Sequence, residues 1–239
     1  MPRIFVTPLV AGEVTITGDE HHYLHRVRRA RPGDAVELVD GAGLRAAAVI
    51  DRITGDHTVV RAEAPSPVVA TPPYVRVLLP LIKGDRMDTC LEKLVEVGAD
   101  EIVLWPAARA VVRLDADRRE ARLAKYRAAL QAGARQCGRA AVPAIRAADS
   151  LTAALASLPA LASSPAAARL VLDPAADRGT LPAADDVTLL SGPEGGIAPE
   201  ELDALAAAGF ASLGLGPRVL RAETAPLVAV ALIRAATGS

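Results

Sequence analysis

Two stretches near the carboxyl end of the chain decide its fold: LLSGPEGGIAPEELDAL at Leu189–Leu205 and LGLGPRVLRAETAPLVAVALI at Leu213–Ile233. Each begins with a short apolar run, breaks at glycines and continues into a helix-forming segment. Glycine loses more backbone freedom on folding than other residues, so this clustering indicates positive φ angles or close approach to a ligand. Loops that leave the carboxyl ends of neighbouring parallel strands meet over one crevice. The two stretches therefore predict two halves of one ligand site.

The residue types in these loops narrow the ligand class. The chain has no GxxxxGK[ST] loop for a triphosphate and no GxGxxG opening a helix after its first strand, which argues against ATP and NAD. Apolar residues stand between and beside the glycines and suit an uncharged ring and its ribose. They are Pro193, Ile197, Pro217, Val219 and Leu220. An adenosine-bearing cofactor without phosphates fits best, and a generic nucleotide-binding protein is an alternative.

The first 64 residues are mostly β-forming, with four short strands predicted around turns rich in glycine and aspartate. The strands are Arg3–Val6, Ala35–Val39, Leu44–Ile53 and Thr58–Glu63. One helix, Asp19–Ala30, interrupts them, and the pattern predicts a small barrel. Ala64–Pro73 (APSPVVATPP) holds four prolines in ten residues and is typical of a stiff linker. We therefore expect two domains, residues 1–70 and 74–239.

Beyond the linker, strand-forming and helix-forming segments alternate. The predicted strands are Val75–Pro80, Glu101–Trp105, Arg169–Leu172, Val187–Leu190 and Ala211–Leu215. The predicted helices are Asp85–Val97, Asp115–Cys137, Pro199–Ala207 and Thr224–Ala236, with a short one within Ala153–Ala168. Alternation of this kind requires crossover connections, so it predicts an α/β fold with a mostly parallel sheet covered on both faces.

Composition limits the cellular setting and the cofactors. The sequence starts without a signal-peptide pattern and has no apolar run of the roughly 18 residues that span a bilayer, so we expect a cytoplasmic protein with no membrane association. Cys90 and Cys137 stand far apart, and the histidine pair His21 and His25 has no third ligand in view, so we expect no metal.

Charge is unevenly distributed although the net charge is only −1. Residues 21–31 hold four arginines and no acid, and residues 118–139 hold seven basic residues against Glu120. Two interpretations of these segments stay open: one positive field over a cleft that contacts RNA, or solvated helix faces, which is the commoner meaning of a charge run.

The motif GPEGG followed by LGPRVLRAETA resembles the carboxyl-terminal motifs of the RNA methyltransferase E family. The resemblance extends upstream through HYLHRVRRARPGDAVELVDG (His22–Gly41), KGDRMDTCLEKLVEVGADEI (Lys83–Ile102) and RQCGRAAVPAI (Arg135–Ile145). It implies an enzyme that uses S-adenosylmethionine to methylate N3 of a specific uridine in small-subunit (16S) ribosomal RNA. It also implies a PUA-like β-barrel as the RNA-binding first domain, a deep trefoil knot of the SPOUT superfamily in the second, and a homodimer.

The resemblance assigns residues to the cofactor, the chemistry and the RNA. Those expected to bind the cofactor are Leu172, Gly192, Pro193, Gly195, Gly196, Ile197, Leu215, Gly216, Val219, Leu220 and Thr224. Thr224 also suits a helix N-cap. Arg221 is expected to stabilise the developing anion, with Glu223, Glu194 or a water as proton acceptor. The expected phosphate contacts are Arg26, Arg29, Lys83, Arg86 and Arg139.

Two other functions compete with this one: a related knotted methyltransferase acting on a ribose 2′-hydroxyl or a guanine, and a non-catalytic RNA-binding or assembly factor. The sequence also departs from the family pattern. Ala198 stands where a capping Ser or Thr is usual, Arg28 replaces a leucine, and Arg135 stands where glutamate is common.

Overall fold

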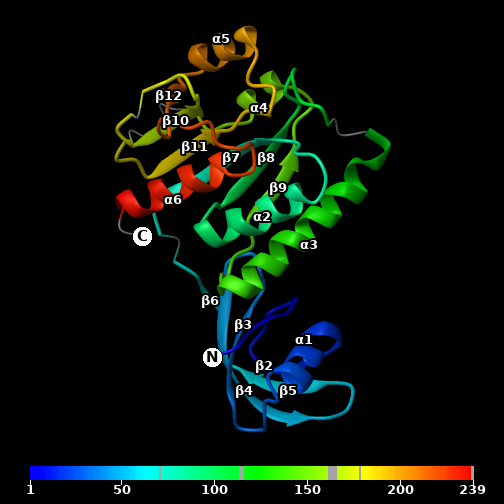
Figure 1. Ribbon diagram of the computed structural model, residues 1–239. Coiled ribbons are helices and arrows are strands. Elements are labelled where there is room, and N and C mark those ends of the chain that lie inside the picture. The colour runs from blue at the N-terminus through cyan, green and yellow to red at the C-terminus, as the bar shows by residue number, and fades with distance from the viewer. Residues whose placement is uncertain (70, 113–115, 161–165, 178, 238–239) are drawn as a thin grey trace. The chain divides into compact units, whose positions relative to one another are not determined.

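The computed structural model describes residues 1–69, 71–112, 116–160, 166–177 and 179–237 (Figure 1). The described chain falls into two compact units. Unit 1 comprises Met1–Val69 together with Ala134–Val142, and unit 2 comprises the rest.

Unit 1 is built on one six-stranded sheet. Its strands are β1 (Arg3–Phe5), β2 (Gly12–Ile16), β3 (Ala35–Val39), β4 (Leu44–Ile53), β5 (Thr58–Ala62) and β6 (Ser66–Pro67). The strand order is β1-β3-β4-β5-β2, with β6 paired to β4. The β1–β3 pair is parallel, whereas the other pairs are antiparallel. Alternate residues of β4 are buried, so one face of the sheet covers an apolar core.

The predicted helix at Asp19–Ala30 forms as two pieces: α1 (Gly18–His22) and a π-helical turn, η1 (Tyr23–Val27). The turn carries Leu24, which is fully buried in the core of unit 1. At its end Ala30 N–H donates to the Leu24 carbonyl at 3.0 Å, and Arg29 takes a φ of 51°. Left-handed backbone at the end of a helix usually belongs to glycine, so Arg29 occupies a strained position.

The segment Ala134–Val142 completes unit 1. A guanidinium nitrogen of Arg135 lies 2.6 Å from a carboxylate oxygen of Glu20. Burial raises the pKa of Glu20, and the charge of Arg135 opposes that rise only in part. Gly41 and Ala141 also pair through an isolated bridge. The basic residue Arg135, a departure from the family pattern, therefore has an acidic partner.

Unit 2 contains a six-stranded sheet in which every pair is parallel. Its order is β12-β10-β11-β7-β8-β9. The strands are β7 (Tyr74–Pro80), β8 (Glu101–Trp105), β9 (Ala144–Ala147), β10 (Ala167–Leu172), β11 (Asp186–Leu190) and β12 (Ala211–Leu213). This confirms the α/β fold with a parallel sheet. Since all strands point one way, the loops after β10, β11 and β12 meet at one edge.

The helices that follow the linker are α2 (Arg86–Val97), η2 (Ala116–Arg118), α3 (Arg119–Cys137), α4 (Leu151–Ala156), α5 (Pro199–Ala207) and α6 (Ala225–Thr237). The last residues of α3 belong to unit 1. Ala154 of α4 and Leu205 of α5 pack with sheet residues in one apolar cluster. Figure 1 shows α2 and α6 side by side, and the two are in contact. The predicted start of α3, Asp115, lies outside the described residues.

Ion pairs and hydrogen bonds of two arginines link neighbouring elements at the amino-terminal edge of the sheet. Nε of Arg76 lies 2.6 Å from a Glu101 oxygen, and only 7% of the Arg76 side chain is exposed. At the end of α6, Nη2 of Arg234 donates to the Gly98 carbonyl and to Asp100, both at 2.6 Å. None of the described helices is both long and apolar enough to cross a membrane.

Candidate functional site

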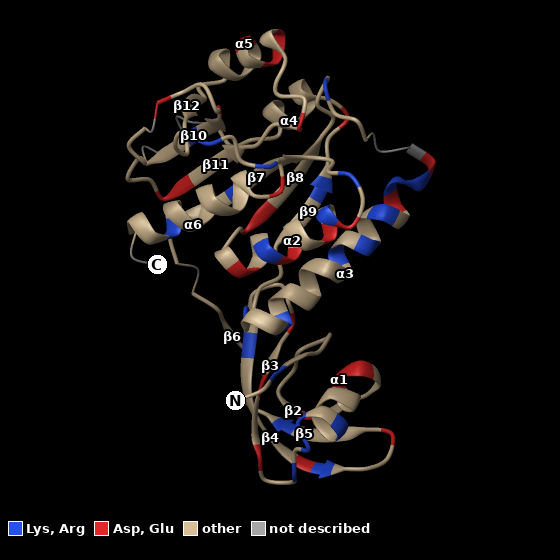
Figure 2. Ribbon diagram, viewed as in Figure 1, with Lys and Arg blue, Asp and Glu red and all other residues tan. Residues whose placement is uncertain are grey.

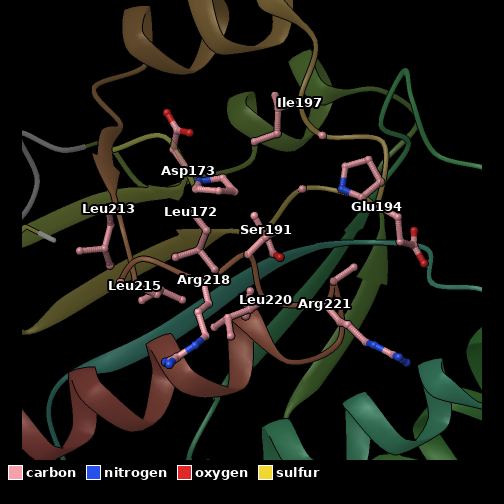
Figure 3. A pocket seen from close by; sticks show the side chains of 18 of the residues that line it. Leu172, Asp173, Ser191, Glu194, Ile197, Leu213, Leu215, Arg218, Leu220 and Arg221 are labelled. Carbon is pink, nitrogen blue, oxygen red and sulfur yellow. The ribbon is translucent and has the colours of Figure 1, made fainter. Parts of the chain in front are cut away.

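A pocket of about 600 Å³ lies at the carboxyl edge of the sheet in unit 2, between the two glycine-rich loops. Figure 3 shows Glu194 and Arg221 at one end of it and Leu213 and Leu215 at the other. Nine residues predicted to bind a cofactor line it: Leu172, Gly192, Pro193, Gly196, Ile197, Leu215, Gly216, Val219 and Leu220. The structure therefore brings the two predicted half-sites together around one cavity.

The glycines of these loops serve different local needs. A Cβ on Gly192 would lie 2.7 Å from Cγ1 of Ile197, inside the pocket wall. A Cβ on Gly195 would lie 2.8 Å from the Arg109 carbonyl oxygen, and Gly195 is not among the lining residues. Gly196 and Gly216 have φ angles of 74° and 124°, which favour glycine. Glycine is required at 192 and 195 because a side chain would clash with neighbouring protein atoms. It is favoured at 196 and 216 because of the backbone angle.

Gly214, which the sequence analysis did not single out, is also needed for packing. A Cβ there would lie 2.7 Å from the Asp177 carbonyl oxygen and closer still to that of Ala176. Its amide donates to the same Asp177 oxygen at 3.1 Å. The close approach joins the end of β12 to the loop after β10, a contact between segments distant in sequence that no local motif signals.

The first loop is anchored where it enters α5. One oxygen of Glu201 accepts from the Ala198 amide at 2.9 Å, and the other accepts from the Ala108 amide at 2.7 Å. Glu201 thus makes one of the two contacts of a capping box, the one to the N-cap amide, whereas Ala198 has no side-chain oxygen to make the other. Because the Glu201 carboxylate also holds the loop after β8, it ties a second segment to the pocket.

Four charged residues gather where the two loops meet. Arg86, at the start of α2, lies 3.3 Å from Glu194 of the first loop and 3.5 Å from Glu223 of the second. Arg221 lies 3.9 Å from Glu223, and 79% of its side chain is exposed. Glu194, Arg86 and Arg221 line the pocket, whereas Glu223 stands just outside the lining. The predicted phosphate contact Arg86 is therefore engaged with both predicted acids.

Two charged lining residues were not predicted, Asp173 and Arg218. Asp173 directly follows β10, and its carboxylate accepts from the Ala175 amide at 2.9 Å in a local turn. Its place after a buried strand is the signal that could have identified it. The other unpredicted lining residues are Pro174, Ser191, Leu202, Leu213, Ala222 and Ala225.

Thr224 is the last residue before α6, and its carbonyl accepts from the Val228 amide at 3.1 Å. That is the backbone pattern of an N-cap residue. Thr224 is not among the residues that line the pocket.

The predicted RNA contacts are divided between the units. Arg26 and Arg29 are exposed in unit 1, which also contains Arg139. Lys83 is exposed and, like Arg86, belongs to unit 2. Figure 2 shows further Lys and Arg residues along the first half of α3.

The part of the chain that the structure describes contains no group of three His, Cys, Asp or Glu residues placed to hold a metal ion. The charged groups around the pocket are instead paired arginines and carboxylates.

Comparison with known proteins gives two family matches. Residues 70–234 match the model of the RNA methyltransferase domain, and residues 16–62 match that of the RNA methyltransferase PUA domain. A Mycobacterium bovis protein described as ribosomal RNA small subunit methyltransferase E is 34% identical, with 95% of this chain and 87% of that protein covered. A Bacillus subtilis protein of the same description is 27% identical, with 93% and 90% covered.

Solved structures agree in fold over the whole length. Ribosomal RNA small subunit methyltransferase E from Neisseria gonorrhoeae, bound to S-adenosylmethionine, superposes with a TM-score of 0.81 at 28% identity, covering 99% of this chain and 98% of that one. A Legionella pneumophila methyltransferase in complex with the same cofactor has a TM-score of 0.79 at 26% identity, covering 98% and 97%.

Proposed function

The chain belongs to the ribosomal RNA small subunit methyltransferase E family, and on that premise we propose that it methylates N3 of one uridine in 16S ribosomal RNA, with S-adenosylmethionine as donor. The observation that carries the proposal is the pocket of about 600 Å³ enclosed by both glycine-rich loops. Related structures hold S-adenosylmethionine.

The pocket fits an adenosine-bearing ligand that has no phosphates. Its volume lies within the range of roughly 300–1,000 Å³ that is typical of small-molecule sites. Its walls are mostly apolar, with Leu172, Ile197, Leu215 and Leu220 placed to surround a flat ring. Asp173 and Glu194 offer carboxylates to hydroxyl or ammonium groups. When bound, S-adenosylmethionine supplies an electrophilic methyl group.

The residues at the mouth of the pocket suit attack by a uracil nitrogen. Forming the new N–CH₃ bond requires loss of the N3 proton, which places negative charge on the ring carbonyls. The exposed guanidinium of Arg221 is available to stabilise that charge. Glu194, Glu223 or a water accepts the proton.

Unit 1 provides the RNA arm in this proposal. Its sheet and its match to a PUA domain support a small barrel that binds RNA. Arg26 and Arg29 project from an acid-free segment suited to phosphates. The target base must be unstacked or single-stranded, since a paired uridine hides N3.

Three further features belong to the same proposal. We propose that the chain from β12 through α6 is threaded as a deep trefoil knot. The return from β12, next to β10, to α6, which contacts β7 and β11, supports this. We also propose a homodimer and, given the ribosomal substrate, a cytoplasmic location.

Two measurements test the function. Calorimetry should show saturable binding of S-adenosylmethionine and no comparable binding of ATP. Mass spectrometry of ribosomal RNA from cells lacking the gene should show one N3-methyluridine missing. A missing 2′-O-methyl group or methylguanine would favour the related knotted methyltransferase, and an unchanged methylation pattern would favour a non-catalytic factor.

A further inference from the structure

Arg86 stands at the only place among the described residues where one side chain contacts an acid from each glycine-rich loop. Its Nη2 lies 3.3 Å from Glu194, and its Nη1 lies 3.5 Å from Glu223. The two loops are otherwise separate stretches, joined through α5 and β12. A guanidinium holds its donors in a rigid planar fork, so it can fix two partners at a set separation.

We propose that Arg86 is a positioning residue that ties the two cofactor loops together and holds Glu194 and Glu223 in place for the reaction, rather than a contact to RNA phosphate. This inference rests on the proposed methyl transfer for its catalytic part. Its structural part, the tie between the loops, stands on the geometry alone. Arg86 acts through the two carboxylates and does not need to touch the substrate.

The surroundings of the acids support this role. The charged and titratable groups in contact with Glu223 are Arg86 and Cys90 from α2 and Arg221 from its own loop. Cys90 donates from its thiol to the Glu223 carbonyl, and burial raises its pKa to about 12, so it stays neutral. The Arg86 side chain is 41% exposed, against 79% for Arg221. Arg86 is therefore the more enclosed of the two positive neighbours of Glu223.

A phosphate contact and a positioning residue give different kinetics. Loss of a phosphate contact raises KM for RNA and lowers the slope of affinity against salt by about one, with kcat unchanged. Loss of the tie lowers kcat because the reacting groups move apart.

The test compares Arg86→Gln and Arg86→Lys with Lys93→Gln, which removes a cation from an exposed pair on the same helix. For Arg86→Gln we expect kcat to fall by about 30-fold or more while KM for RNA stays within a few fold. Arg86→Lys should restore only part of kcat, because an ammonium group lacks the planar fork of the guanidinium. Lys93→Gln should match the wild type in kcat and KM.

Hydrogen exchange supplies a readout that does not depend on activity. The amides of residues 192–196 and 216–223 should exchange at least about threefold faster in Arg86→Gln than in wild type or Lys93→Gln. Unchanged exchange in both loops would overturn the tie. An unchanged kcat with a weaker salt slope would overturn the positioning role in catalysis. If the wild type itself transfers no methyl group, the proposed function fails, and hydrogen exchange still decides the tie.

Discussion

Gly192 and Ile197 are packed so closely that a Cβ on Gly192 would lie 2.7 Å from Cγ1 of Ile197. Both residues line the pocket. In Gly192→Ala the first loop must shift, so we expect affinity for S-adenosylmethionine to fall at least about tenfold by calorimetry.

The control for Gly192→Ala is a second substitution at Ile197, the residue that the new methyl group would meet. Ile197→Ala removes the atoms that the new methyl group would strike, so the double variant Gly192→Ala/Ile197→Ala should bind the cofactor more tightly than Gly192→Ala alone. If the double variant lost as much binding free energy as the two single variants together, the steric explanation would be wrong.

Arg221→Ala should leave cofactor affinity within a few fold and lower methyl transfer by about two orders of magnitude or more. Its guanidinium is exposed at the pocket mouth, where it can reach a substrate anion. Single-turnover kinetics with ribosomal RNA measures the effect. Lys93→Ala, which breaks an exposed pair with Glu96 outside both basic segments, is the control. Wild-type turnover in Arg221→Ala would remove Arg221 from the mechanism.

Substitutions at Arg29 can test backbone strain and RNA binding separately, because the φ of 51° at this position favours glycine. Arg29→Gly should be more stable than Arg29→Ala by about 1 kcal/mol in urea unfolding. Both variants should nevertheless lose RNA affinity equally, because both lack the guanidinium. The double variant Arg26→Ala/Arg29→Ala should lower the salt slope by about two. A slope equal to that of wild type would mean that unit 1 is not the RNA arm.

The lowered pKa of Glu101 predicts that the free energy of unfolding depends on pH. Burial alone would raise its pKa, but hydrogen bonds and charge from Arg76 and Arg146 bring the pKa below its usual value. Its contribution is therefore present above the unfolded pKa of about 4.3 and is lost as the pH falls through the lower folded value. At pH 7, Glu101→Gln should cost about 2 kcal/mol of unfolding free energy, a moderate loss because Asp186 still faces Arg76.

The measurement is urea unfolding of wild type and Glu101→Gln at several pH values. The difference between them should shrink as the pH falls below about 4.3. Glu120→Gln, which alters an exposed carboxylate, should differ from wild type by less than about 0.5 kcal/mol throughout. A difference that is constant with pH would contradict the role of the buried ion pairs.

Elements with strong local signals were predicted closely. The predicted strand Glu101–Trp105 and helix Pro199–Ala207 match β8 and α5, since an apolar run and a proline at the first helical position mark them. β9, at Ala144–Ala147, was not predicted because four residues with one buried side chain show no period. The π-helical turn η1 was also missed, because its wider winding depends on packing around Leu24 rather than on a local pattern.

The candidate site likewise has parts that a local sequence signal predicts and parts that depend on contacts between distant segments. Glycine-rich loops are visible in the sequence, so the two halves of the pocket were predicted and are found together. The contacts of Arg86 with Glu194 and Glu223 join three separate segments, which local spacing cannot reveal. The resemblance matched Arg86 to a basic position of the family and suggested a phosphate contact, and in the fold Arg86 lies beside two acids.

The two thiols of this chain differ sharply in reactivity. Cys90 is buried, with its pKa raised to about 12, whereas Cys137 is exposed at the end of α3. Because the thiolate is the nucleophile, a maleimide fluorophore should attach to Cys137 alone in the native protein. A single dye could therefore be placed beside the RNA-binding half without engineering a cysteine or disturbing the cofactor pocket.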